Sequence, residues 1–443
     1  MMTRYLLLLL PLLSAFLPSQ GHVPDKEIRN RLDRIDAARL EKTVRDLVGF
    51  GTRHTLSDKA SETRGIGAAQ RYLSQQFASI AAEPKSRLTV HEDTFHVPPG
   101  RRVPDGATLV NVVATLPGTD PERFVIVSGH YDSRAKGDMD ATSDAPGAND
   151  DASGTALVVE AARVLADLPT RATVLFMAVS GEEQGLLGAA AHAARAKEQR
   201  HRIEAMITND IVGGVIGSNG QREPMRVRLF SEGVPSGAAA GSLVGSDNDA
   251  PSRQLARYIK ARGEAYLPGF GVTMIFRQDR YLRGGDHKAF NDQGFPGVRF
   301  TECHENYDWQ HQNVIHADGK VLGDLPENVD YAFLKRVTQV NVASLLELAL
   351  APAPPRQVRV IVSELTPHTE LRWAKNSEAD VAGYGILYRR THEPDWTHRV
   401  TVGPDQISHQ LEGVSKDDWY FAVEAFDNQG HRSLPIYPKP ARM

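Results

Sequence analysis

Hydrophobic residues at helical spacing and at strand spacing alternate along the first 350 residues of the chain. Their spacing predicts one or two helices within 25–50 and further helices over 63–80, 152–168, 184–196, 254–262 and 331–350. Apolar runs predict strands over 88–95, 109–116, 124–128, 172–179, 203–208 and 297–300. Strands that alternate with helices indicate an α/β fold, and we expect a three-layer sandwich around a mostly parallel, mixed sheet.

The pattern changes beyond residue 350. Ala351-Pro-Ala-Pro-Pro355 predicts a linker over 351–356, because consecutive prolines end a helix and stiffen the chain. Short runs separated by turn residues then predict strands over 358–365, 370–374, 383–389, 399–402 and 419–426. We therefore expect an α/β domain over 22–350 and a small all-β sandwich over 357–443.

The N-terminus has the features of a cleaved signal peptide over residues 1–21. Arg4 precedes an apolar run that reaches Leu17, and small and polar residues follow it. This run is short for a membrane span, so we expect a secreted or periplasmic protein with no stable membrane association after cleavage. Cys303 is the only cysteine, which excludes an internal disulfide. The net charge of -4, without a concentrated basic run, argues against nucleic acid as a partner.

Polar side chains with metal-binding chemistry follow consecutive predicted strands. His130 ends the strand over 124–128, Asp150 lies in the loop APGANDDASG, Glu182 and Glu183 follow the strand over 172–179, and Asp210 follows the strand over 203–208. The carboxyl ends of strands in an open α/β sheet form the ligand-binding edge. Because imidazole and carboxylate groups are the ligands that zinc prefers, the sequence predicts a zinc site at this edge. The Gly-, Ser- and Pro-rich stretch 213–250 predicts a loop over it.

Two zinc ions about 3.5–4 Å apart need a bridging carboxylate and terminal ligands on each ion. We assign Asp150 as the bridge, His130 and Asp210 to one ion, and Glu183 with a histidine to the other. Three carboxylates and a bridging hydroxide offset the four positive charges. On chemistry alone the fifth ligand stays open among four histidines late in this domain, which are His287, His304, His311 and His316.

Two further carboxylates near these ligands have different expected roles. Asp132 stands two residues after His130, where its carboxylate could accept the second ring N–H and fix the tautomer. Glu182 precedes a proposed ligand but is free itself, which suits it to act as the general base. Asp151, Ser153 and Gly154 are expected to shape the turn and cap the following helix.

With these residues in view, the chain resembles the co-catalytic dizinc aminopeptidases of the secreted bacterial leucine-aminopeptidase type. The resemblance covers roughly Leu47 to Leu350 and rests on GHYDS, PGANDDASG, SGEEQGLLGA, the ND of ITND, and RGGDHKAF followed by HQ. It implies two Zn²⁺, peptide substrates, Glu182 as the base, and as ligands His130, Asp150, Glu183, Asp210 and His311.

The resemblance also implies a role for His287 and leaves the oxyanion donor open. His287 is expected to support the pocket, with Asp286 orienting it. Some family members place a tyrosine near this turn as an oxyanion donor; Tyr281 and Arg283 lie close but align poorly. The C-terminal segment resembles a fibronectin type III module through LRW, VAGYGILYRR and WYFAVEAFD, with Trp373 as a core residue. Such a module implies positioning or attachment and no chemistry.

Three other functions stay open from the sequence. Glutaminyl cyclases on this fold keep much of the same ligand set. A carboxypeptidase would need cationic groups aimed at a substrate carboxylate, which Arg277, Arg280 and Arg283 could supply. A non-catalytic ectodomain would usually lack ligands, whereas every ligand position here holds a competent residue. Pocket preference, native metal and oligomeric state do not follow from the sequence.

Overall fold

A computed structural model of the chain describes residues 24–235, 250–317 and 319–442. The predicted signal peptide over 1–21 lies outside the described residues, as does much of the predicted loop over 213–250. No helix in the described part of the chain combines the length and the apolar character that crossing a bilayer requires.

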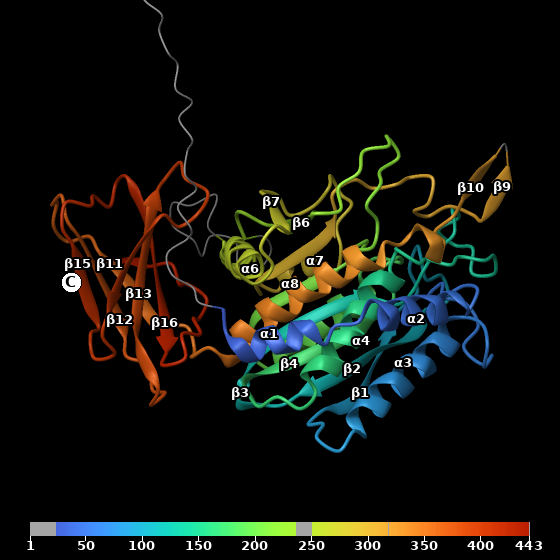
Figure 1. Cartoon of the computed structure of the whole chain (residues 1–443), viewed down its shortest axis with the longest axis horizontal. Helices are drawn as coiled ribbons and strands as arrows, with labels where there is room; N and C mark the ends of the chain where they lie inside the picture. Colours follow the sequence, from blue (N-terminus) through green and yellow to red (C-terminus); the bar gives the residue numbers. More distant parts are fainter. Residues whose placement is uncertain (1–23, 236–249, 318, 443) are drawn as a thin grey trace, which may run out of the picture.

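The first part of the described chain is built around an eight-stranded mixed sheet (Figure 1). Its strands, in spatial order, are β1 (Thr89–Val97), β2 (Ala107–Leu116), β4 (Thr170–Val179), β3 (Gly118–His130), β5 (Arg202–Asn209), β8 (Gly297–Glu302), β6 (Arg226–Ser231) and β7 (Gly271–Ile275). The four central strands β4, β3, β5 and β8 are parallel, while β1, β2 and the β6–β8 pair are antiparallel. The expected mixed, mostly parallel core of the sheet is confirmed.

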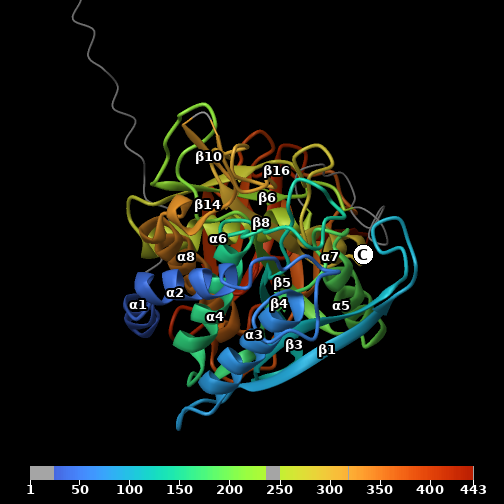
Figure 2. The same ribbon diagram turned by 90° about the vertical axis from the view of Figure 1, so that its right-hand side faces the viewer.

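Helices cover both faces of this sheet and complete three layers. One face packs against α1 (Lys26–Asp33), α2 (Ala37–Val48), α3 (Ile66–Ala81), α4 (Ala152–Leu165), α6 (Pro251–Tyr266) and α8 (Tyr331–Leu350). The other face packs against α5 (Leu187–Glu198) and the short α7 (His287–Asp292). Figure 2 shows α5 and α7 on the opposite side of the strands from α1 and α2.

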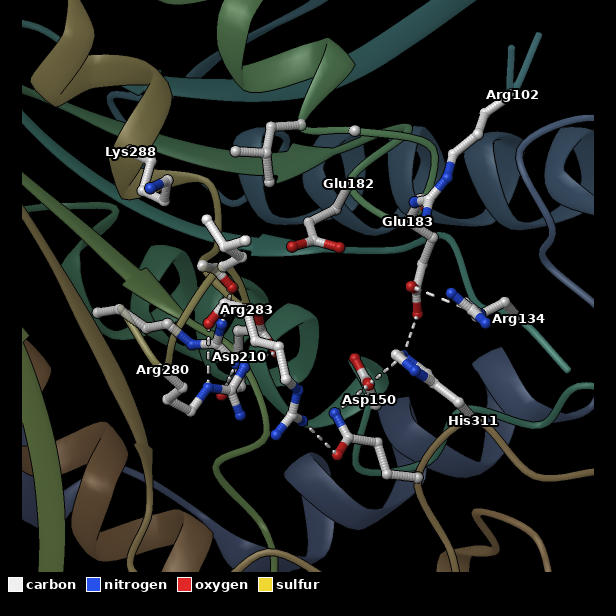
Figure 3. A pocket seen from close by; sticks show the side chains of 16 residues that line it. Arg102, Arg134, Asp150, Glu182, Glu183, Asp210, Arg280, Arg283, Lys288 and His311 are labelled. Carbon is white, nitrogen blue, oxygen red and sulfur yellow. Dashed lines mark hydrogen bonds and ion pairs between the residues drawn. The ribbon is translucent and has the colours of Figure 1, made fainter. Parts of the chain in front are cut away.

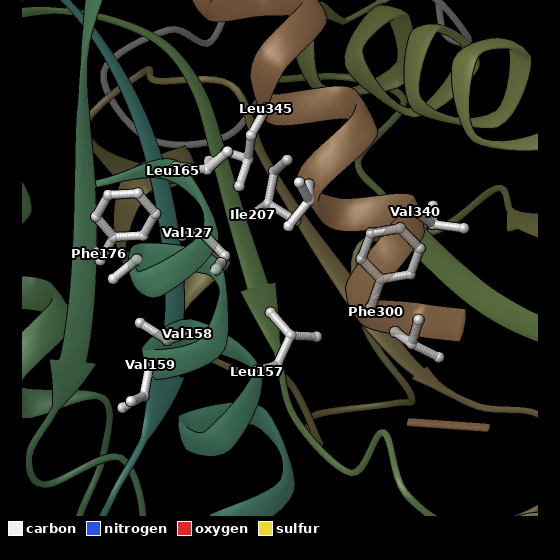
Figure 4. Packing of buried hydrophobic residues seen from close by; sticks show 14 of the residues in the cluster. Val127, Leu157, Val158, Val159, Leu165, Phe176, Ile207, Phe300, Val340 and Leu345 are labelled. Carbon is white, nitrogen blue, oxygen red and sulfur yellow. The ribbon is translucent and has the colours of Figure 1, made fainter. Parts of the chain in front are cut away.

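Alternate side chains of β3 point to opposite faces of the sheet, so this strand packs against the helices of both layers. Val125 and Val127 are fully buried in the core under α4 and α8, whereas Ile126 between them is buried in the core under α5. Figure 4 shows the larger core, in which Val127 lies near Leu157 of α4. Because β3 is covered on both faces, its inner half is apolar throughout, and only its end is free to carry chemistry.

Several elements differ from the sequence-based expectation. The helix expected over 184–196 begins only at Leu187, because Ser180 to Leu186 form a tight turn closed by backbone hydrogen bonds such as Gly185 N to Glu182 O (2.8 Å). The predicted loop 213–250 contains strand β6, whose arginines alternate with Val227 and Leu229. A two-stranded hairpin of β9 (Ile315–Ala317) and β10 (Lys320–Leu322), a short 3₁₀ helix over Pro326–Asn328 and α7 were not predicted, since each is too short for a periodic signal.

The C-terminal part forms two small sheets. One has the order β15 (Ser408–Leu411), β12 (Thr369–Ala374), β11 (Arg356–Ile361), β17 (Lys439–Ala441), and the other β14 (His398–Val402), β13 (Val381–Arg390), β16 (Trp419–Asp427). Trp373 and Leu371 from the first sheet share a core with Ile386 and Val423 from the second. The separate all-β part is therefore confirmed, while its resemblance to a fibronectin type III module stays a prediction.

Ion pairs join the all-β part to the large sheet. Arg171 of β4 contacts the carboxylate of Asp380, and its Nη2 lies 3.1 Å from Asp427 Oδ2, which is almost fully buried. Tyr258 of α6 donates a hydrogen bond to the carbonyl of Arg432 (2.7 Å). Besides the predicted linker over 351–356, polar contacts from β4 and α6 therefore hold the all-β part against the α/β part.

Replacing Arg171 with Met should loosen this contact. The substitution leaves Asp427 with one cationic partner fewer, and losing a charge-assisted hydrogen bond to a buried carboxylate costs about 1.5–3 kcal/mol. We expect a lower unfolding temperature and faster limited proteolysis at the linker. Arg202→Met is the matched control, because Arg202 pairs with the partly exposed Asp120 (3.1 Å) within the large sheet. Equal effects of the two substitutions would contradict this role for Arg171.

Candidate metal centre and active site

The carboxyl ends of three adjacent strands supply most of the candidate site. His130 is the last residue of β3, Glu182 and Glu183 follow β4 in the turn before α5, and Asp210 follows β5 directly. Since β4, β3 and β5 are neighbours and parallel, their ends meet at one edge of the sheet. Figure 3 shows Glu182, Glu183 and Asp210 around a common pocket with Asp150 and His311.

Asp150 lies between two histidines from distant parts of the chain. Its Oδ1 is 3.2 Å from Nε2 of His130, and its Oδ2 is 2.9 Å from Nε2 of His311. The same His311 nitrogen is 2.9 Å from Oε1 of Glu183, while Nε2 of His130 is 3.8 Å from Oδ1 of Asp210. Each oxygen of one carboxylate therefore faces a different set of potential ligands.

Two groups of side chains in the described residues could each hold an ion. Asp150, Glu183 and His311 form one, and His130, Asp210 and Glu182 form the other, with ligand atoms within 4.8 Å of one another in each group. The structure thus brings together all six residues expected at the site. Glu182 lies in the group with His130 and Asp210, so its position alone allows it to be a ligand of an ion held there as well as a base.

The structure separates His311 from the three histidines that were equally open on chemistry. His287 is buried, its Nε2 lies 2.8 Å from the carbonyl oxygen of Gln278, and burial lowers its pKa to about 3. His304 is half-buried, His316 is exposed, and neither belongs to a metal-binding group in the described chain. The expected support of His287 by Asp286 is wrong, since neither carboxylate oxygen of Asp286 makes a hydrogen bond within the described residues.

The chemistry of these groups fits zinc. Their donors are imidazole nitrogens and carboxylate oxygens, and His130, Asp150, Glu183 and Asp210 are each at most 5% exposed. Nε2 of His130 is buried and makes no hydrogen bond to any described residue. Although burial opposes protonation, the carboxylates of Asp132, Asp150 and Asp210 raise the pKa of His130 well above its ordinary value. The same negative field attracts a metal cation in place of the proton.

Asp132 organises the turn that carries both glutamates. Its carboxylate is fully buried and accepts hydrogen bonds from the backbone N–H groups of Gly181 (3.0 Å), Glu182 (3.2 Å) and Glu183 (3.1 Å). It lies 3.6 Å from Nδ1 of His130, whereas the backbone carbonyl of Asp132 is 3.2 Å from that nitrogen. The expected histidine contact is therefore made by the main chain, and the carboxylate holds the glutamate turn.

The loop that carries Asp150 is fixed from two sides. Asp324 accepts hydrogen bonds from the backbone N–H groups of Asn149 (2.9 Å) and Asp150 (2.7 Å). Asp151 caps α4 by accepting from Gly154 N (2.9 Å) and also accepts from His130 N (3.0 Å), which confirms the expected cap. A side chain at Gly154 would lie 2.1 Å from the carbonyl oxygen of Asn209, so only glycine lets α4 approach β5 this closely.

Three side chains that contact the proposed ligands or their backbone were not predicted from the sequence. Gln310 donates to Asp150 Oδ2 (3.1 Å), and Arg299 Nη2 lies 2.9 Å from Asp210 Oδ1. Arg299 could have been noticed, because an arginine inside the apolar run of β8 is unusual. Asp324 lies outside any periodic element and has no such signal.

The metal-binding groups form one wall of a pocket of about 270 Å³. Arg283 lines this pocket, whereas Tyr281 does not: its side chain is 82% exposed and its ring packs 3.6 Å from the guanidinium of Arg277. Of the two residues considered as oxyanion donors, only Arg283 lies near the site. The fold and the two metal-binding groups together define an α/β protein with a candidate metal centre at the carboxyl edge of its sheet.

Comparisons with known proteins identify the family. The profile of peptidase family M28 matches residues 111–344 of the chain. A probable zinc metalloprotease from Leptosphaeria maculans is 41% identical over 423 residues, which cover 94% of this chain and 98% of the relative. The chain therefore belongs to peptidase family M28.

Solved structures agree with this fold. The LapA aminopeptidase of Legionella pneumophila has a TM-score of 0.52 at 17% identity, over 75% of this chain and 78% of LapA. An aminopeptidase from Aneurinibacillus sp. strain AM-1 has a TM-score of 0.50 at 17% identity, over 73% of this chain and 96% of its own. The α/β sandwich of the described chain is thus a fold that these enzymes share.

Replacing Asp132 with Asn should weaken metal binding without removing a ligand. The amide has one acceptor oxygen for the three backbone N–H groups of the glutamate turn, so Glu183 loses its fixed position. Removing a group that orients metal ligands typically lowers affinity 10–100-fold, and titration with Zn²⁺ against a competing chelator measures this. Asp140→Asn is the control, because Asp140 accepts from the N–H groups of Thr142 and Ser143 in a turn away from the pocket. Unchanged zinc affinity in Asp132→Asn would exclude this role.

Proposed function

We propose that this protein is a secreted aminopeptidase that uses two zinc ions to hydrolyse the N-terminal peptide bond of peptides. The observation that carries the proposal is the position of Asp150, which directs one oxygen at His130 and the other at His311. A carboxylate placed in this way suits two ions about 3.5–4 Å apart. The signal-peptide pattern of residues 1–21 supports secretion.

The names of similar proteins support the metal and the reaction. The Leptosphaeria maculans relative is described as a probable zinc metalloprotease, and the Legionella and Aneurinibacillus structures are described as aminopeptidases. The ligand chemistry of the site agrees with zinc independently of these names. We therefore assign His130 and Asp210 to one ion, Glu183 and His311 to the other, and Asp150 to both.

Bound zinc ions would supply an activated water and polarise the scissile carbonyl. The part of the reaction left to the chain is proton transfer, and Glu182 is placed for it beside His130 and Asp210. Burial raises the pKa of Glu182 well above its ordinary value, and the carboxylates of Asp210 and Glu183 raise it further. A carboxyl group tuned in this way can take a proton from water and deliver it to the leaving amine.

The side chains around Glu182 keep it available for this role. Its backbone N–H is held by Asp132, which fixes the turn, while its own carboxylate points into the pocket (Figure 3). Glu183, the next residue, turns toward His311 instead. The two adjacent glutamates thus have separate tasks, one as a ligand and one as a proton carrier.

Replacing Glu182 with Gln tests the base against the ligand alternative. If Glu182 carries the proton, the variant keeps its zinc and loses roughly 10²–10⁴-fold in kcat, because the amide cannot accept the proton. Zinc content by atomic absorption and turnover of an aminoacyl p-nitroanilide are measured together, with the exposed Glu198→Gln of α5 as control. Loss of zinc in step with activity would make Glu182 a ligand, and full activity would remove it from the mechanism.

The number of bound zinc ions tests whether Asp150 is shared by two ions or the chain holds a single ion. We expect two zinc ions per wild-type chain and about one in His311→Ala. We expect fewer than one in Asp150→Ala, because Asp150 contacts both His130 and His311 and its loss would weaken both sites. Removing zinc with a chelator should abolish turnover, and returning it should restore it. A wild-type protein that holds one ion at saturating zinc would contradict the two-ion arrangement, as would full activity of the stripped protein.

A carboxypeptidase is a second candidate, because Arg280 and Arg283 line the pocket and could hold a terminal carboxylate. The two candidates differ in which end of the peptide must be free. Turnover of an aminoacyl p-nitroanilide, which has no carboxylate, favours the aminopeptidase. Exclusive turnover of N-acetylated peptides with a free C-terminus would favour the carboxypeptidase.

A further inference from the structure

The pocket beside the metal-binding groups is lined mainly by charged side chains. Six of its residues are cationic: Arg102, Arg134, Arg280, Arg283, Lys288 and Arg299. Its four carboxylates all belong to the two metal-binding groups, which are Asp150, Glu182, Glu183 and Asp210. Among the described residues that line it, Leu186 and Leu282 are the only large apolar ones, and Leu282 is 95% exposed. Such a wall offers little to an apolar substrate side chain.

Arg280 and Arg283 belong to a cluster that has more cations than carboxylates. Both contact the same oxygen of Glu305, at 2.6 Å and 2.8 Å, and Arg228 contacts its other oxygen at 3.0 Å. Three guanidinium groups therefore share one carboxylate. By contrast, Lys288 lies 3.1 Å from Asp279, and Arg299 lies 2.9 Å from Asp210. The cluster around Glu305 keeps a net positive charge.

Arg283 is also close to the expected reaction centre. Its Nη2 donates to Oε1 of Gln310 (3.1 Å), and Nε2 of Gln310 donates to Oδ2 of Asp150 (3.1 Å). One glutamine side chain thus separates this guanidinium from the carboxylate that faces both metal-binding groups. The Arg283 side chain is 43% exposed, so a substrate can reach it. Figure 3 shows Arg280 and Arg283 on the Asp210 side of the pocket, opposite Arg102 and Arg134.

We propose that Arg280 and Arg283 bind a carboxylate of the substrate, so that the enzyme prefers peptides with an anionic group next to the cleaved bond. A guanidinium group matches a carboxylate in a two-point contact, and the positive cluster gains its missing counter-charge when the carboxylate arrives. The inference rests on the proposed peptidase activity. The carboxylate comes either from an Asp or Glu side chain beside the cleaved bond or from the C-terminus of a very short peptide.

Matched peptide pairs test the preference and identify its source. Glu- and Gln-containing tripeptide amides, varied on each side of the cleaved bond, test the side chain; a dipeptide and its C-terminal amide test the terminus. Charge-assisted hydrogen bonds imply that the wild-type enzyme favours the carboxylate member of at least one pair by roughly 10–100-fold in kcat/KM. The preferred pair tells which source is used.

Arg283→Gln is the test variant and Arg101→Gln its control. Arg101 carries the same charge and is exposed, but it does not line the pocket. We expect Arg283→Gln to bring the preferred pair to within about threefold of parity in kcat/KM, and Arg101→Gln to retain the full preference. Arg283→Lys, which keeps the charge but not the two-point contact, should keep part of it.

Binding gives a readout that does not depend on turnover. The zinc-loaded Glu182→Gln protein should bind the carboxylate member of the preferred pair more tightly than its amide, and adding Arg283→Gln should remove that difference in calorimetric titration. Wild-type ratios near unity for every pair, or a preference that survives in Arg283→Gln, would overturn the inference while leaving the peptidase proposal intact. A zinc-loaded wild type that cleaves none of the peptides would instead overturn the peptidase proposal.

Discussion

The site depends on one carboxylate that is shared between two groups of ligands. Asp150 faces His130, at the end of β3, with one oxygen and His311, from a loop far along the chain, with the other. This contact requires the loop before α4 to hold Asp150 over the ends of the central strands. The buried carboxylates of Asp151 and Asp324 fix that loop by accepting hydrogen bonds from its backbone and from His130. The geometry of the centre is thus set by main-chain hydrogen bonds around it.

The concentration of buried carboxylates would be costly without cations. Asp132 lies two residues after the end of β3, Asp210 directly follows β5, Asp150 and Asp151 lie in the loop before α4, and all four are nearly or fully buried. Hydrogen bonds from backbone N–H groups offset part of that cost at Asp132 and Asp151. Bound metal cations would offset the rest at the carboxylates that we propose as ligands. The buried negative charge is therefore consistent with a protein whose fully folded state includes its metal ions.

Beyond the carboxylates the charge of the pocket reverses. Glu305 forms ion pairs with three arginines. Gln310 links one of them, Arg283, to Asp150 through hydrogen bonds. A pocket with both charges can orient a zwitterionic substrate, because the carboxylates of the pocket attract its ammonium group and the arginines around Glu305 attract its carboxylate. The lining provides few apolar contacts, which distinguishes this pocket from one shaped for leucine-like side chains.

The sequence by itself determined the α/β sandwich, the change to short strands after residue 350, and which strand ends carry the proposed ligands. These follow from periodicity, since an apolar run that stops at His130 or Asp210 marks both a buried strand and the edge where ligands bind. The resemblance to a known family then selected His311. Only the tertiary structure decided that the carboxylate of Asp132 holds the glutamate turn, and that Gln310 links Arg283 to Asp150. The contacts of Asp132 span 49 to 51 residues and the contact between Gln310 and Asp150 spans 160 residues. They lie in turns and irregular loops, where no local period indicates which side chains will meet.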